Sequence, residues 1–184
     1  MTTNALTKQM RSLRVVRRFA DRPIHDDVLA DVLEVARWTG TSKNTQPWHV
    51  VIVRERGTLR ALSQLGQFAG HLAGAQLALA LVMEGVNNAF DCGRLAERLM
   101  LAAWAHGVGS CIGSIWPDDN TRKAKELLAI PEERWMRHAI SLGYPADDDA
   151  TKVRTTPELA RALPSIGRRP MADFVSWERY GTKR

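Results

Sequence analysis

Hydrophobic residues recur along the chain with two spacings, one typical of helices and one of strands. The clearest helical spacing lies in residues 26–39, where Val28, Leu29, Val32 and Ala36 recur every three or four positions after two acids in the first turn. Continuous apolar runs at residues 48–54 and 76–83 are typical of buried strands. The pattern therefore predicts helices alternating with strands, which is an α/β or α+β class of fold.

The remaining elements are predicted from the same spacings and from the positions of Gly and Pro. A basic helix is expected over residues 7–19, with Arg11, Arg14 and Arg17 on one face at 3.6 residues per turn. A long helix over residues 91–106 is apolar on more than one side, so we expect it to be buried on two sides, one of them against another subunit. Further helices are expected at 59–65, 68–73 and 120–129, and further strands at 109–115 and 137–143.

Length and composition predict a cytoplasmic protein of one domain, residues 1–184, whose residues 165–184 form a C-terminal tail. The 184 residues are enough to bury a core without disulfides or metal. The two cysteines, Cys92 and Cys111, form no CxxC motif, which argues against a disulfide scaffold or a structural zinc site. The first residues are polar and the most apolar run, 75–83, is far shorter than the ~20 residues of a membrane helix, so neither a signal peptide nor a membrane span is expected.

Positive charge is concentrated at the two ends of the chain. The net charge is +6; residues 1–22 carry six positive charges against one acid, and residues 165–184 carry five against two. Three interpretations remain open at this point: a nucleic-acid footprint, a pocket for one phosphorylated ligand built from both ends, or solvated surface charge.

Motifs for protein-based catalysis are missing from the sequence. There is no GxGxxG or GxxxxGK[ST] after a strand, no HExxH and no GxSxG. The five histidines are scattered without metal-ligand spacing, and each is interpreted as a structural or surface residue. No side chain is proposed as a catalytic acid, base or nucleophile and no metal is expected, so a bound cofactor should carry any catalysis.

Three segments, taken in order, carry a more specific signal. They are LRVVRRF at 13–19, followed by Pro23; TSKNTQPW at 41–48; and HGVGSCIG at 106–113, with LGYP at 142–145. In this order and spacing they resemble the FMN-dependent nitroreductase family, and the resemblance covers roughly residues 8–180.

The resemblance implies an α+β fold with a central, mostly antiparallel sheet flanked by helices, in an intertwined homodimer with FMN at the interface. It also implies an FMN-containing oxidoreductase that takes electrons from NADH or NADPH as co-substrate. These electrons pass by ping-pong hydride transfer to a small organic acceptor, nitroaromatic or quinone-like. No nucleic-acid or membrane partner is expected.

Family positions carried over to this chain give the expected cofactor contacts. In the basic segment these are Arg14, Val15 and Arg17, with Arg17 beside the flavin N1/O2 edge and tuning its chemistry. In the loop that precedes Trp48, the expected contacts are Thr41, Ser42, Asn44 and Gln46, which in the family often come from the opposite subunit. The others are Gln67 at the O4/N3 edge, a backbone N–H among Ile112, Gly113 and Ser114 facing N5, and Arg168 and Arg169 at the phosphate.

The chain departs from the family pattern at three places. Leu13 stands where the commonest form has Arg, Val15 where it has Ser, and Gly40-Thr41 where it has Pro-Ser. Two alternatives therefore stay open beside the reductase: a flavin oxidase or desaturase that uses oxygen, and a flavin-binding protein without turnover. For Arg17 the alternative is an exposed i,i+4 ion pair with Asp21.

Overall fold

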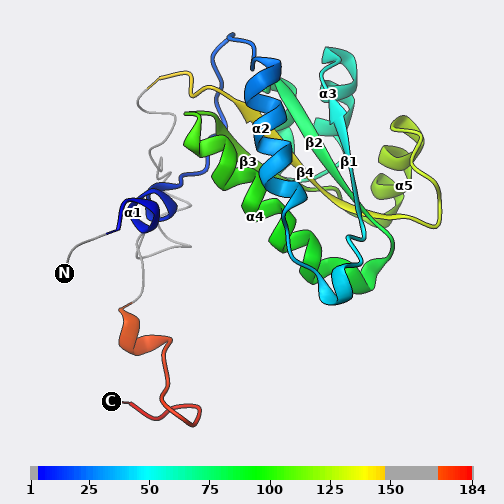
Figure 1. Ribbon diagram of the computed structural model, residues 1–184. Helices are drawn as coiled ribbons and strands as arrows, with labels where there is room; N and C mark the ends of the chain where they lie inside the picture. Colours follow the sequence, from blue (N-terminus) through cyan, green and yellow to red (C-terminus); the bar gives the residue numbers. More distant parts are fainter. Residues whose placement is uncertain (1–3, 148–169, 184) are drawn as a thin grey trace. The chain divides into compact units, whose positions relative to one another are not determined.

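A four-stranded antiparallel sheet lies at the centre of the fold (Figure 1). Its strands are β1 (Trp48–Val53), β2 (Leu77–Met83), β3 (Gly109–Ser114) and β4 (Trp135–Gly143). They run in the order β1-β2-β4-β3, so β1 and β3 form the two opposite edges. All residues of β2 are buried, as its continuous apolar sequence predicts. The predicted antiparallel sheet is confirmed, and each predicted strand is found to within two residues at its ends.

Helices cover both faces of this sheet (Figure 1). On one face α2 (Asp26–Arg37) and α4 (Ala89–Ala105) pack against the leucines of β2. On the other face α3 (Arg56–Ser63), the 3-10 helix η2 (Gly70–Gly74) and α5 (Asp118–Leu127) enclose a second core against the alanines of β2. The segment 68–73, predicted as a helix, is thus the short 3-10 helix η2.

The computed structural model describes residues 4–147 and 170–183. The chain divides into two compact units, Met1–Thr151 and Lys152–Arg184. The sheet and α1 to α5 belong to the first unit, and the described part of the second contains one 3-10 turn, Met171–Asp173.

The basic segment departs most from the prediction, because the expected helix over 7–19 is wrong in its second half. Helix α1 spans only Ala5–Ser12, and the chain beyond Leu13 is extended. Val15 forms a parallel bridge with Ser110, and the Val16 N–H donates to the Ser110 carbonyl at 2.9 Å. Two consecutive β-branched residues fit such an edge pairing better than a helix interior. Arg11, Arg14 and Arg17 therefore do not share a helical face.

Candidate functional site

The outer edge of β3 carries backbone donors that face away from the sheet. The Ser110 carbonyl accepts from Val16, so the backbone polar groups of Ser110 point to this edge. Backbone groups of every second residue in a strand point the same way, which directs the N–H groups of Ile112 and Ser114 outward. Ile112, Gly113 and Ser114 are the last three residues of β3.

Glycine at two positions, Gly66 and Gly113, allows neighbouring groups to lie close to the end of β3. A Cβ at Gly66 would lie 2.2 Å from the Ser114 carbonyl oxygen, and a Cβ at Gly113 would lie 3.0 Å from His71 Nε2. The first contact is closer than any side chain tolerates and the second would force the imidazole to shift, so glycine allows the backbone and the imidazole to approach the strand. Gln67 directly follows Gly66 and is exposed, which brings the predicted amide to the end of β3.

Arg17 lies at the same edge. Burial raises the pKa of the Cys111 thiol, and the charge of Arg17 together with a side-chain hydrogen bond offsets part of that rise. Burial, and then the charge of Arg17, lowers the pKa of His71 to about 4. Asp21 instead pairs with Arg56 at 3.5 Å. Arg17 therefore interacts with Cys111 and His71 rather than with Asp21.

Arg14 and Val15 are exposed near this edge, and Arg14 has local partners. Its Nη1 donates to the carbonyls of Arg11 at 2.9 Å and Leu13 at 2.8 Å, which are otherwise free at the C-terminal end of α1. Arg168 and Arg169, the expected phosphate contacts from the C-terminal end, lie outside the described residues.

The polar loop with Thr41, Ser42, Asn44 and Gln46 lies away from this edge. It leads into β1, at the opposite side of the sheet from β3. With strands about 4.8 Å apart, β1 and β3 are separated by about 14 Å. The loop holds itself together: the Gln46 N–H donates to Thr41 Oγ1 at 3.1 Å and Gln46 Nε2 to Asn44 Oδ1 at 3.2 Å. Within one chain this loop therefore leads into the sheet edge opposite β3.

His71 is the site residue that sequence reasoning missed. It is 8% exposed, and its Nδ1 lies 2.7 Å from Ser141 Oγ, whereas its Nε2 has no hydrogen-bond partner. A purely structural role for His71 explains the contact of Nδ1 with Ser141, but it does not explain why Nε2 is buried without a partner. Its place four residues after Gln67 was the one available signal.

The β3 edge suits a planar, polar ring. It offers outward N–H donors, a cation at Arg17 and two glycines where any Cβ would intrude. Within residues 4–147 and 170–183, no group of three His, Cys, Asp or Glu side chains could hold a metal ion. No helix in those same ranges is long and apolar enough to cross a membrane.

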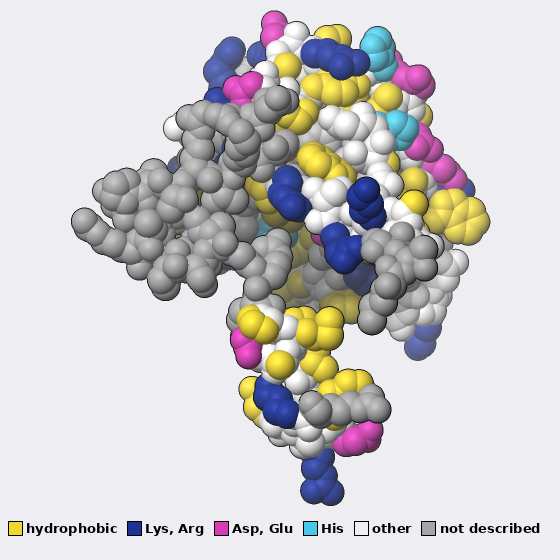
Figure 2. Space-filling view, turned by 90° about the vertical axis from the view of Figure 1, so that its left-hand side faces the viewer, with side chains coloured by type: hydrophobic (Ala, Val, Ile, Leu, Met, Phe, Trp, Pro, Cys, Tyr) yellow, Lys and Arg dark blue, Asp and Glu magenta, His cyan; other side chains and the backbone are white. Residues whose placement is uncertain are grey.

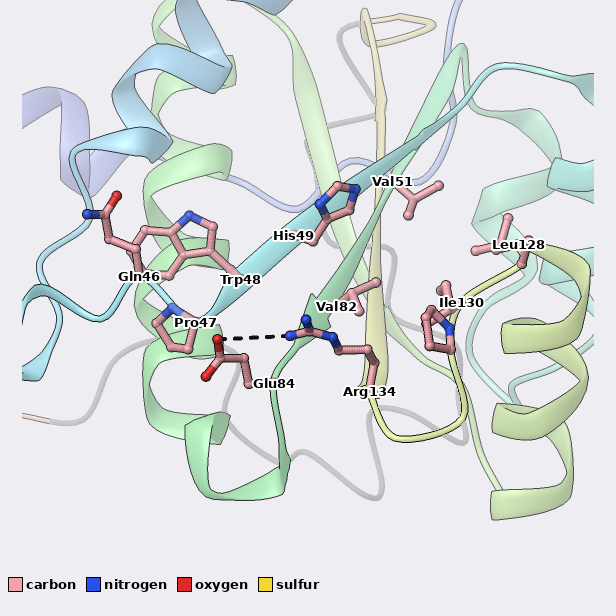
Figure 3. Close-up of a pocket in the computed structure, with 12 residues that line it drawn as sticks. Gln46, Pro47, Trp48, His49, Val51, Val82, Glu84, Leu128, Ile130 and Arg134 are labelled. Atoms are coloured by element: carbon pink, nitrogen blue, oxygen red, sulfur yellow. Dashed lines mark ion pairs between the residues drawn. The ribbon is translucent and has the colours of Figure 1, made fainter.

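Hollows on the first unit also lie away from the β3 edge. A cavity of about 470 Å³ beside β1 contains Trp48, His49 and the Glu84–Arg134 ion pair at 4.0 Å (Figure 3). It lies at the sheet edge opposite β3. A larger, mostly apolar groove of about 950 Å³ runs along α4 beside α1, between side chains that include Met10, Phe90 and Leu101. Figure 2 shows Lys and Arg side chains lying among hydrophobic ones on the side of α1 and β3.

The chain was compared with known proteins. Residues 10–84 and 84–144 match the sequence family described as the nitroreductase family. A protein of Archaeoglobus fulgidus with the provisional name NADH dehydrogenase/NAD(P)H nitroreductase is 32% identical over 149 residues, covering 77% of this chain and 86% of its own. An NADH dehydrogenase of Thermus thermophilus is 34% identical over 175 residues, covering 73% and 84%.

Solved structures share the fold. A provisionally named nitroreductase from Desulfovibrio desulfuricans, solved in complex with FMN, superposes with a TM-score of 0.77 at 20% identity, covering 97% of this chain and 99% of that one. At this identity the likeness establishes the fold.

Proposed function

The chain belongs to the nitroreductase family, and we propose that it is an FMN-dependent NAD(P)H oxidoreductase that passes electrons to a small organic acceptor. The observation that carries this proposal is the outer edge of β3, where the N–H groups of Ile112 and Ser114 face outward beside Arg17. Bound FMN would supply the two-electron chemistry, accepting hydride from NAD(P)H and delivering electrons to a nitroaromatic or quinone-like acceptor.

The residues of this chain hold and tune the flavin in this proposal. The outward N–H donors bind the ring edge where hydride arrives, and Gly113 permits the close approach of His71 to the strand. The Arg17 guanidinium stabilises the negative charge that two-electron reduction places on the N1/O2 edge. Gln67 binds the O4/N3 edge, Val15 contacts the flavin through its backbone, and Arg14, Arg168 and Arg169 bind the phosphate.

A second copy of the chain completes the site. The loop with Thr41, Ser42, Asn44 and Gln46 leads into β1, which lies about 14 Å from β3 across the sheet of its own chain. In this proposal the loop therefore reaches a flavin at β3 from a partner. This separation supports a homodimer with FMN at the interface.

Absorption spectra of the purified protein test the enzyme assignment. We expect an oxidised flavin spectrum that bleaches anaerobically on addition of NADPH or NADH and returns when a nitroaromatic or quinone is added. A flavin that NAD(P)H does not reduce would contradict the reductase and leave a flavin-binding protein. Reoxidation that oxygen supports and the organic acceptors do not would indicate an oxidase.

Titration with FMN and riboflavin tests the phosphate contacts. Charge-assisted hydrogen bonds are worth roughly 1.5–3 kcal/mol each, so riboflavin should bind tenfold or more weakly than FMN. Equal affinities would remove the assignment of Arg14, Arg168 and Arg169 to the phosphate.

A further inference from the structure

The hydrogen bonds of Ser141 assign the proton of neutral His71 to Nδ1. Ser141 Oγ lies 3.2 Å from the Cys111 carbonyl oxygen and donates its single proton there. The same hydroxyl oxygen can then only accept from His71 Nδ1, at 2.7 Å. Since burial and the charge of Arg17 keep the imidazole neutral down to about pH 4, Nε2 is left as a bare acceptor.

This acceptor is buried at the candidate site without a partner. His71 is 8% exposed, and Nε2 is shielded from solvent with no hydrogen bond in the described residues. It lies under Gly113, close enough that a Cβ there would approach it to 3.0 Å. An unpaired buried acceptor costs about 1–3 kcal/mol, so its retention at this place calls for a donor.

Arg17 is a cationic donor whose charge acts on this imidazole. The chain leaves Val16, bound to the β3 edge, and places the Arg17 guanidinium against Cys111, the residue to which Ser141 is bonded. Two groups from packed elements act on His71: Arg17 from the extended segment and the Ser141 hydroxyl from β4. Cys111 of β3 interacts with both of them.

We propose that His71 is a positioning residue whose Nε2 accepts an N–H from Arg17 and holds that guanidinium toward the bound flavin. This inference rests on the proposed function. A neutral acceptor suits the task better than the alternatives: a carboxylate would neutralise the charge of Arg17, and an imidazolium would repel it. The full positive charge of Arg17 then remains available to the reduced flavin.

Two substitutions distinguish the contribution of Nδ1 from that of Nε2. His71→Asn keeps an amide N–H near the Nδ1 position for Ser141 and lacks an acceptor at the Nε2 position. His71→Gln reaches further and can place its carbonyl oxygen where Nε2 stands. We expect His71→Asn to bind reduced FMN three- to tenfold more weakly relative to oxidised FMN, and His71→Gln to restore most of the difference. A tenfold change corresponds to about 30 mV in a two-electron potential.

Redox titration of FMN-saturated variants measures this shift, with Arg17→Ala and the double variant Arg17→Ala/His71→Asn alongside. If His71 acts through Arg17, the double variant has the potential of Arg17→Ala alone. Independent, additive shifts would overturn the proposal, as would an unshifted potential in His71→Asn or equal potentials in the Asn and Gln variants.

Nitrogen-15 NMR of histidine-labelled protein tests the same pairing without catalysis and without a His71 variant. Wild-type protein should show Nδ1 protonated and Nε2 bare between pH 5 and 8. On addition of FMN, the Nε2 resonance should move toward that of a hydrogen-bonded acceptor in the wild type and stay in place in Arg17→Ala. Bound FMN with an unmoved Nε2 would refute the role of His71 alone, whereas no binding of FMN would refute the proposed function with it.

Discussion

At the scale of single residues, the β3 edge combines one permanent charge with groups that stay neutral. Arg17 is cationic at any ordinary pH, because a guanidinium does not lose its proton in proteins. Burial raises the pKa of Cys111, which keeps the thiol protonated, and lowers the pKa of His71, which keeps the imidazole uncharged. The charge of Arg17 is therefore not cancelled by either neighbour.

The lowered pKa of His71 predicts a dependence of stability on pH. Its pKa is about 4 in the folded protein against 6.5 for the free side chain, so below pH 6.5 the unfolded chain binds the proton more readily. Stability contributed by neutral His71 is complete above pH 6.5 and is lost as the pH falls toward 4. Between pH 7 and pH 5 the loss should be about 2 kcal/mol.

Urea unfolding at pH 7 and pH 5 measures this loss, with His71→Gln as the control. His138 also has a lowered pKa, but it is present in both proteins and cancels in the comparison. The variant should lose less stability than the wild type over this interval. An identical loss in both would show that His71 titrates normally.

Substitution of Arg17 should change the flavin potential, whereas substitution of Arg14 should change affinity. Arg17→Ala removes the cation beside the N1/O2 edge, so the two-electron potential of bound FMN should fall and its reduction by NAD(P)H should slow. Arg17→Lys should keep much of the charge effect while losing the planar fork. Arg14→Ala should weaken FMN binding and leave the potential of the bound flavin nearly unchanged. Redox titration of the FMN-saturated proteins decides, and an unshifted potential in Arg17→Ala would remove Arg17 from the flavin edge.

Sequence reasoning found the backbone part of this site and missed its buried polar part. Motif order located Arg17, Gln67 and the end of β3, which the fold does bring together. His71 escaped because a lone histidine in a short 3-10 helix has no periodic signal. Its role depends on the Ser141 hydroxyl of β4, 70 residues further along the chain, and only the fold shows that the two side chains are in contact.

At the scale of elements, sequence periodicity placed the helices and strands wherever one face is buried against the sheet. The pattern failed at residues 13–19, where arginines flank Val15 and Val16. This segment is too short for the spacing of its apolar residues to distinguish a helix from a strand. The backbone pairing with Ser110 determines the extended conformation of this segment instead. This pairing also covers the first residues of β3, since an uncovered edge strand invites association with other chains.

Glycine at position 109 is required for that pairing. A Cβ at Gly109 would lie 2.5 Å from a methyl carbon of Val16, which is fully buried. Gly109→Ala should therefore push Val16 from the strand and destabilise the fold by about 1–3 kcal/mol. Gly74→Ala is the matched control, because nothing lies within 4 Å of a Cβ at Gly74.

Thermal or urea unfolding of both variants tests this requirement. Gly109→Ala should also bind FMN more weakly, since displacement of Val16 moves Arg17. Equal stabilities for the two variants would show that the segment 13–19 adapts to the extra methyl group without loss.

At the scale of the whole molecule, two features call for a second copy of the chain. The polar loop before β1 and the open edge of β3 stand on opposite sides of one sheet. The groove along α4 leaves Phe90 77% exposed and Met10 49% exposed, in a hollow whose surface is mostly apolar. The apolar residues on more than one side of the helix expected over residues 91–106 predict a second subunit against it, because a single small domain cannot cover them all.

Disruption of the α4 groove should separate the copies and release the cofactor together. We expect the wild-type protein to be a dimer of 20.6 kDa chains in light scattering at micromolar concentration. Phe90→Asp places a charge in the apolar groove, so it should shift the protein toward the monomer and weaken FMN binding at least tenfold. Affinity falls in this account because each flavin loses the loop with Asn44 and Gln46, although neither residue is altered. Leu127→Asp provides the control: Leu127 is 43% exposed on α5, on the other face of the sheet, and its substitution should leave both mass and affinity unchanged. A Phe90→Asp protein with the mass of one chain and wild-type affinity for FMN would show that one copy holds the flavin by itself, and the role of the partner's loop would then be withdrawn.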